Sequence, residues 1–207
     1  MFSLSDAFDV EKQLRLGFSL PLPMIYSLTL ETALLVVGIA LVTGHLAALS
    51  FGSFVQRHLR AFPRSVPSGV LLFVAAAGWF AGLVAFTDLG EFSSMRSKFL
   101  LFTVVGAGLM LRFVQEFLSV RALGMLLLLA AEPLLEACWM RQETGRLWLV
   151  GLVYGWIVAG LFFIGTPYVL RDAIHWASAA GWRWKAVCIS GIAYGVLLLA
   201  TRSAMGV

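Results

Sequence analysis

Six long stretches of apolar residues alternate with short polar segments along the chain. A helix that crosses a bilayer needs about 20 mostly apolar residues, with a range of roughly 17–25. The pattern therefore predicts an all-α membrane protein, a six-helix transmembrane bundle that forms one domain over residues 1–207. The predicted spans are residues 24–51, 69–86, 99–117, 120–140, 146–170 and 186–203.

The boundary between the third and fourth spans falls within one long apolar stretch. Residues 99–140 are interrupted by Arg112, Glu116, Ser119 and Arg121. A single helix over that stretch would be about 63 Å long, roughly twice the thickness of a hydrocarbon core. We therefore predict two helices that are joined by a tight turn at residues 117–120.

Amphipathic segments flank the spans. Residues 1–20 mix charged and apolar side chains, and Pro21 and Pro23 follow them. This pattern predicts a short N-terminal interfacial helix that ends before the first span. Residues 52–68 form a basic connector with an amphipathic start, and residues 171–185 contain three tryptophans, which are typical of the aromatic belt at a membrane surface.

Composition supports the membrane assignment. Hydrophobic residues make up 60% of the 207 residues and charged residues 13%, and the mean hydropathy is +0.92. An average soluble domain has about 45–50% apolar and about 25% charged residues. These values exclude a water-soluble enzyme, a disordered regulator and a fibrous protein.

Charge gives a weak signal for orientation. We call the side on which the first span begins side A, and the opposite side, reached by the first, third and fifth spans, side B. The formal net charge is +4, which we attribute to contacts of basic residues with lipid headgroups rather than with nucleic acid. We expect side B to be cytoplasmic and the location to be a bacterial cytoplasmic (inner) membrane. Side B carries Arg57, Arg60, Arg64, Arg112, Arg121, Arg171, Arg183 and Lys185, and side A carries Lys12, Arg15, Arg96, Lys98, Arg141, Arg146 and Arg202.

Acidic residues inside the spans are the strongest candidates for a functional site. Glu132 and Glu136 are four residues apart and share a helix face, and Pro133 between them frees a backbone carbonyl at Leu129. Glu132 lies about 18 Å along its span, where a charge costs several kcal/mol. A broken helix with carboxylates and a free carbonyl is suited to binding a cation. The predicted ion- or solute-binding residues in the side-A half are Glu31, Glu132, Glu136 and Tyr154.

The same residues also have structural interpretations. Glu136 and Glu31 lie close enough to span ends to reach water, and Glu132 can pair with a cation or hydroxyl on another helix. Arg121 lies on the same stripe of its helix as Glu132, because eleven residues bring the two within about 20° of each other. We expect that stripe to face the bundle interior or a partner subunit.

An inner charged cluster is predicted on side B. Arg112 and Glu116 are spaced to pair along one helix, and Arg121 is placed to reach Glu116 across the turn. One interpretation is a clamp that holds the hairpin at the membrane surface. The other is a site for an anion or a lipid headgroup, because arginine suits phosphate recognition.

Cofactor chemistry has little support in the sequence. His45 and His175 are possible ligands of a bis-histidine haem, but His175 lies in an interfacial segment, so we predict no cofactor. The motifs of serine hydrolases and zinc proteases are lacking, and we name no catalytic residue. Cys138 and Cys188 are expected to be buried free thiols.

Three Gly-x-x-x-Gly pairs mark helices that we expect to pack closely. They are Gly78/Gly82, Gly151/Gly155 and Gly191/Gly195, and such pairs let helix backbones approach one another in lipid. We favour packing inside the bundle and expect another helix to approach Gly155 closely. The alternative is the interface of a homo-oligomer.

Three functions are compatible with these patterns. The first is a transporter or channel that moves an ion or small solute past an intramembrane acidic site, which the Glu132 region favours. The second is a non-catalytic subunit or assembly factor of a larger membrane complex, which the short loops favour. The third is a lipid-modifying membrane enzyme, which is disfavoured because the carboxylates and histidines lie in opposite halves.

Overall fold

The structure is a computed structural model that describes residues 28–113, 116–143 and 145–204. The predicted N-terminal interfacial helix lies outside these residues. The described chain is built from α-helices and two short 3-10 segments, and we found no strand in it. The elements are α2 (Leu30–Ser50), α3 (Gly52–Ala61), η1 (Phe62–Arg64), α4 (Val66–Phe86), η2 (Gly90–Met95), α5 (Arg96–Phe113), α6 (Leu118–Ala137), α7 (Gly145–Gly165), α8 (Tyr168–Ser178) and α9 (Gly181–Ser203).

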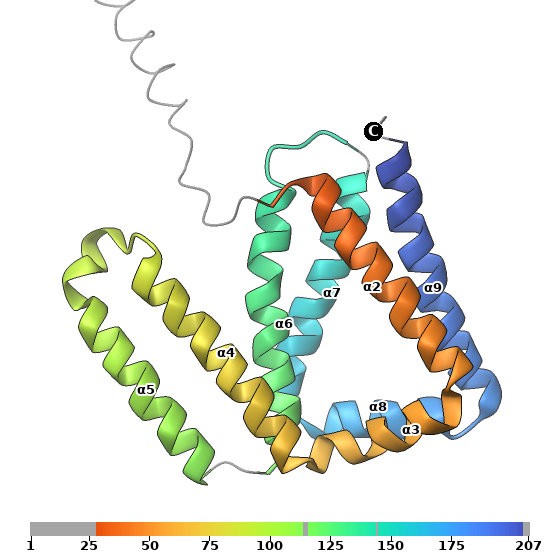
Figure 1. Ribbon diagram of the computed structural model, residues 1–207, viewed down its shortest axis with the longest axis horizontal. Coiled ribbons are helices and arrows are strands. Elements are labelled where there is room, and N and C mark those ends of the chain that lie inside the picture. The colour runs from red at the N-terminus through yellow and green to blue at the C-terminus, as the bar shows by residue number, and fades with distance from the viewer. Residues whose placement is uncertain (1–27, 114–115, 144, 205–207) are drawn as a thin grey trace, which may run out of the picture.

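Six segments are long and apolar enough to span a membrane. They are α2, α4, the η2–α5 segment Gly90–Phe113, α6, α7 and α9. The protein is therefore an all-α integral membrane protein, as the sequence predicts. The spans alternate in direction, so the N-terminal end of α2 and the C-terminal end of α9 lie on side A (Figure 1).

The third and fourth spans are separate helices, as the sequence predicts, but the predicted turn at residues 117–120 is misplaced, because residues 118–120 already belong to α6. Helix α5 ends at Phe113 and α6 begins at Leu118. Phe117 precedes α6 with a φ of 55°, a left-handed conformation that non-glycine residues rarely adopt. The hydroxyl of Ser119 donates a hydrogen bond to the carbonyl of Phe62 at 2.7 Å, which ties the start of α6 to η1.

A compact apolar core joins four of the spans in the side-A half. Its buried residues come from α2, α6, α7 and α9 and from Cys138 at the end of α6. Burial of such side chains is favourable by about 1.5–3 kcal/mol each in water, but in lipid close packing is the main stabilising term. The core residues are Leu30, Ala33, Leu34, Val37, Ala131, Leu134, Ala137, Cys138, Leu149, Val153 and Leu198.

Glycines mark the closest helix crossings. A Cβ on Gly124 of α6 would lie 2.7 Å from the carbonyl oxygen of Gly160 on α7. A Cβ on Gly195 of α9 would lie 2.9 Å from the carbonyl oxygen of Gly38 on α2. The prediction for Gly155 is wrong within the described chain, because nothing lies within 4 Å of the position of its Cβ. Of the Gly-x-x-x-Gly pairs, Gly191/Gly195 is the one that packs tightly against a neighbouring helix.

The α4–α5 hairpin leans away from the other spans. Figure 1 shows α4 next to α6 at side B and diverging from it towards side A, with α5 on the outer flank. The close end is fixed by Gly69, where a Cβ would lie 2.8 Å from the backbone nitrogen of Ser119. Phe73, Leu118 and Ala122 are buried together just above this contact.

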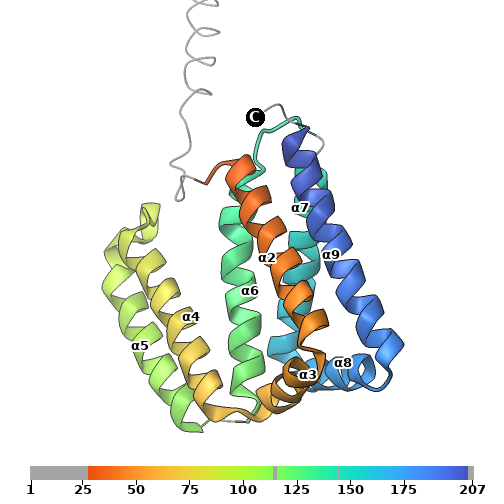
Figure 2. The same ribbon diagram turned by 45° about the vertical axis from the view of Figure 1, so that its right-hand side comes forward.

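Two short helices lie across the side-B ends of the spans. Helix α3 connects α2 with η1, and α8 connects α7 with α9; the two lie side by side (Figures 1 and 2). The guanidinium of Arg60 donates hydrogen bonds of 2.9 Å to the hydroxyl and to the carbonyl oxygen of Ser178. The indole of Trp184 donates to the carbonyl of Ala48 at 3.1 Å. Because the chain turns into α8 at Tyr168, the fifth span ends at Gly165, earlier than the predicted residue 170.

Candidate functional site

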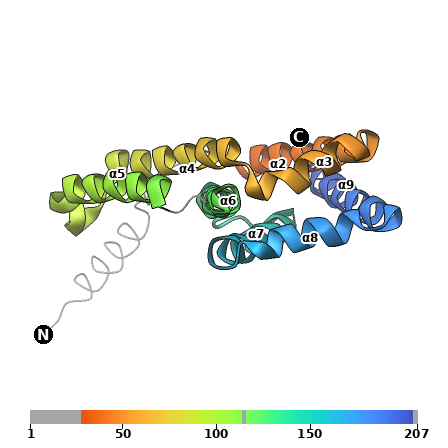
Figure 3. The same ribbon diagram turned by 90° about the horizontal axis from the view of Figure 1, so that it is seen from below.

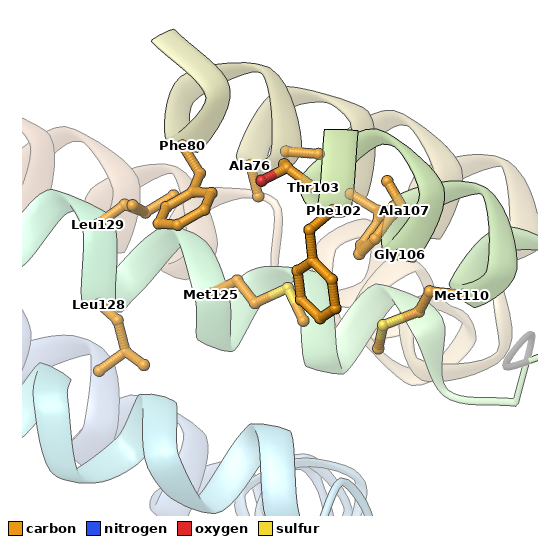
Figure 4. A pocket seen from close by; sticks show the side chains of 12 residues that line it. Ala76, Phe80, Phe102, Thr103, Gly106, Ala107, Met110, Met125, Leu128 and Leu129 are labelled. Atoms are coloured by element: carbon orange, nitrogen blue, oxygen red, sulfur yellow. The ribbon is translucent and has the colours of Figure 1, made fainter. Parts of the chain in front are cut away.

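An apolar groove lies between the α4–α5 hairpin and α6. Its cavity volume is about 460 Å³ (Figure 4). Thr103 brings the only side-chain hydroxyl to the lining, and that hydroxyl donates to the carbonyl of Phe99 at 2.8 Å. The groove therefore suits an apolar occupant. It is lined by Phe73, Ala76, Ala77, Phe80, Phe102, Thr103, Gly106, Ala107, Met110, Met125, Leu128 and Leu129.

The groove exists because the hairpin diverges from α6. Aromatic side chains of the hairpin and apolar side chains of α6 line the space between them. Figure 4 shows Leu129 beside Phe80 of α4, and Met125 beside Phe102 of α5. Figure 3 shows α6 standing between the hairpin and the pair α7 and α8.

Glu132 lies one turn beyond the groove lining, on the same side of α6. Residues three and four apart share a helix face, so Glu132 lies on the face formed by Leu128 and Leu129. We call the stripe of Met125, Leu128, Leu129 and Glu132 the groove face of α6. Glu132 is exposed, whereas its neighbour Ala131 is buried in the core. By its place in the helix, Glu132 therefore lies one turn beyond the side-A end of the groove lining, on a face of α6 that is turned away from the core.

Pro133 frees a backbone carbonyl oxygen near the carboxylate of Glu132. Helix α6 continues through Pro133 to Ala137. Because proline has no N–H, the carbonyl of Leu129 loses its helical partner. A carboxylate and a backbone carbonyl thus lie within one turn of each other. Both are acceptors, and together they suit a positively charged group.

The other residues of the predicted acidic site have different surroundings. Glu31 is half-buried in the first turn of α2, where a negative charge is favoured by the helix dipole. Glu136 is half-buried in the last turn of α6, and Tyr154 of α7 is 58% exposed. Between α2, α6, α7 and α9 the side-A half is filled by the apolar core. A common site for all four residues stays a prediction.

The inner charged cluster is divided by the end of a helix. Arg112 is exposed in the last turn of α5, and Glu116 follows after the helix has ended. Their spacing along one continuous helix, which the sequence analysis assumed, is therefore lost. Glu116 instead lines a cavity of about 450 Å³ with Arg64, Val66 and Phe117. Arg121 is half-buried in the first turn of α6, and between described residues no ion pair joins it to Glu116.

The two candidate haem ligands lie in separate environments. The ring of His45 packs against Gly191 of α9, and its Nδ1 lies 2.8 Å from the carbonyl oxygen of Leu41. His175 is exposed on α8. Among the described residues, no group of three or more His, Cys, Asp or Glu side chains is arranged to hold a metal ion.

Both cysteines are buried free thiols, as the sequence predicts. Cys138 lies just beyond the end of α6. Burial raises the pKa of its thiol from 9.0 to about 11, and the positive charge of Arg146 opposes part of that rise. A thiol of this kind is protonated and poorly reactive at neutral pH.

Comparison of the chain with protein-family models, with curated proteins and with solved structures gives no match. The function is therefore inferred from the site alone. The sequence predicts Glu132 as a binding residue on a helix stripe, but it does not predict the groove beside that stripe. Met125, Leu128 and Leu129 repeat on the same face as Glu132, and this repeat was the available signal.

Proposed function

We propose that the protein moves a small amphipathic cation across the membrane along the groove between the α4–α5 hairpin and α6. The observation that carries this proposal is the groove face of α6, on which Glu132 follows one helical turn beyond the apolar lining. An occupant of the groove needs an apolar body to match the lining. It needs a positive charge to pair with Glu132 at the side-A end.

The position of Glu132 favours a charged substrate over a neutral one. An acidic side chain in a spanning segment costs at least about 2.5 kcal/mol when it is ionised without a partner. A bound cation offsets that cost when the site is occupied.

A route along the groove is preferred to a route through the bundle. The apolar core between α2, α6, α7 and α9 leaves little space for a hydrated ion in the side-A half. The groove, in contrast, lies beside a hairpin that is attached to α6 at its side-B end. Movement of the hairpin about that attachment would widen or narrow the route. We place the protein in a bacterial cytoplasmic membrane, with side B in the cytoplasm.

Uptake of ethidium, an apolar aromatic cation, tests the proposal. Purified protein is reconstituted into liposomes that contain DNA, and the rise of ethidium fluorescence reports entry. We expect the wild type to exceed protein-free liposomes and Glu132→Gln to fall to the protein-free rate. Glu91→Gln is the matched control, because Glu91 is also an exposed glutamate but belongs to η2 and not to the groove face of α6.

Two results would contradict the proposal. One is a wild-type rate equal to that of protein-free liposomes. The other is full ethidium uptake by Glu132→Gln. Thermal unfolding of each variant in detergent establishes that a loss of uptake is not a loss of folding.

A subunit of a larger membrane complex is the alternative function. It is favoured by α5, because none of its residues, Arg96–Phe113, is buried. Gly78 and Gly82 on α4 also have open space at the positions of their Cβ atoms, which a helix of another subunit would fill. In this case the reconstituted protein shows no ethidium uptake, and its native mass includes a second polypeptide in fixed stoichiometry.

A further inference from the structure

The side-B end of the molecule carries an excess of positive charge. Its described residues include eight arginines and lysines but only two acidic residues, Glu116 and Asp172. The ion pair between Arg171 and Asp172, at 2.9 Å, neutralises one of the basic residues. At the opposite end, the acidic residues near the span ends are Glu31, Asp88, Glu91, Glu136 and Glu143. Side A also has five described basic residues, which balance these five acidic residues, so the excess of positive charge lies on side B. They are Arg96, Lys98, Arg141, Arg146 and Arg202.

The α3–α8 pair gives this charge a defined platform. Arg60 joins the two helices through Ser178, and Trp184 joins the start of α9 to the end of α2. Next to the α3–α8 contact, Arg57 of α3, Arg64 of η1 and Lys185 of α9 are exposed. The platform therefore holds several cations at one level, beside the ends of the spans.

Large aromatic side chains are exposed next to these cations. Phe54 is 61% exposed on α3, and Trp176 and Trp182 are 56% and 68% exposed. The guanidinium of Arg183 lies 5.2 Å from the ring centroid of Trp176 and 5.4 Å from that of Trp182. Aromatic rings beside arginines are typical of segments that lie in the headgroup layer.

From this combination we infer that the α3–α8 platform binds the headgroups of anionic phospholipids in the leaflet on side B. The cations match the phosphates of an anionic headgroup, and the aromatic side chains need the apolar layer directly beneath it. A soluble acidic protein would satisfy the cations but would leave the aromatic side chains in water. The inference is independent of the proposed transport function.

Native mass spectrometry of the detergent-solubilised protein tests this inference. The probes are phosphatidylglycerol and phosphatidylcholine with the same acyl chains, and the measurement is the apparent Kd of each lipid. We expect phosphatidylglycerol to bind more tightly. Arg57→Gln/Lys185→Gln should weaken its binding on the order of five-fold per charge removed, and added salt should also weaken it.

A matched double variant on side A is the control. Lys98→Gln/Arg141→Gln removes two exposed positive charges from the opposite end and should leave the Kd of phosphatidylglycerol unchanged. Equal Kd values for the two lipids would overturn the inference. So would an equal loss in both double variants, or binding of polyglutamate without binding of phosphatidylglycerol.

Discussion

At the scale of single residues, the role that we propose for Glu132 follows from its neighbours along α6. Leu128 and Leu129 one turn before it line the groove, and Pro133 after it removes a donor from the carbonyl of Leu129. The sequence alone predicts that Arg121 and Glu132 share a stripe and that the Pro133 region is unusual. It does not predict what that stripe faces, because the direction depends on how α4 and α5 are tilted.

The buried thiol of Cys138 leads to a prediction on reactivity. In a Cys188→Ser variant, alkylation of Cys138 by iodoacetamide should be slow at pH 8. The thiolate is the reacting form, and little of it is present at pH 8 because the pKa of the thiol is raised to about 11. The rate should keep rising between pH 9 and pH 11. The denatured chain, with an ordinary thiol, should react quickly at pH 8.

An exposed cysteine is the control for this measurement. Ser93→Cys in the variant that lacks both native cysteines places a thiol on η2, where residue 93 is exposed. It should react at pH 8 at the rate of a free thiol. Native Cys138 reacting as fast as this control would show that the thiol is accessible and its pKa is not raised.

At the scale of helices, hydropathy predicts the spans but not all of their contacts. Six apolar stretches are sufficient to predict six helices. An unpaired backbone N–H or C=O group is costly in lipid, and a helix pairs these groups within each span. The helices α3 and α8 were predicted only as amphipathic or interfacial segments. Their pairing includes the long-range contact between Arg60 and Ser178, which local sequence does not encode.

Glycine spacing also has limits as a guide to packing. A Gly-x-x-x-Gly pair shows that a smooth surface exists on one helix, but the partner helix must face it. Gly155 lacks such a partner in the described chain, whereas Gly124 and Gly160 meet across α6 and α7 without forming a pair on either helix. The contact could not be predicted from one helix at a time.

This difference predicts that two matched substitutions change the free energy of unfolding to different extents. Gly124→Ala forces a methyl group against the carbonyl of Gly160, so it should lower the free energy of unfolding by about 1–3 kcal/mol. Gly155→Ala adds the same methyl group in open space and should not destabilise the protein. Thermal or detergent-induced unfolding of the purified variants measures both. Equal stability of the two variants would mean that α6 and α7 do not pack through Gly124.

At the scale of the whole molecule, the bundle and the hairpin divide the protein into a packed part and an open part. The core joins α2, α6, α7 and α9, while the hairpin is fixed to α6 near Gly69 and Phe73 and leaves the groove beside it. The positive charge gathers at the side-B end. The packed part forms the frame of the molecule, and the open part contains the groove that we propose as the transport route.

The most direct test of the groove as the transport route is a pair of substitutions on α5. Gly106 lines the groove and Gly108 does not, and both have open space at the positions of their Cβ atoms. Gly106→Leu therefore adds a side chain to the groove lining from a position where a Cβ meets nothing within 4 Å, whereas Gly108→Leu adds the same side chain outside the lining. In the liposome assay we expect Gly106→Leu to lose ethidium uptake and Gly108→Leu to keep the wild-type rate. Uptake by Gly106→Leu at the wild-type rate would contradict the account.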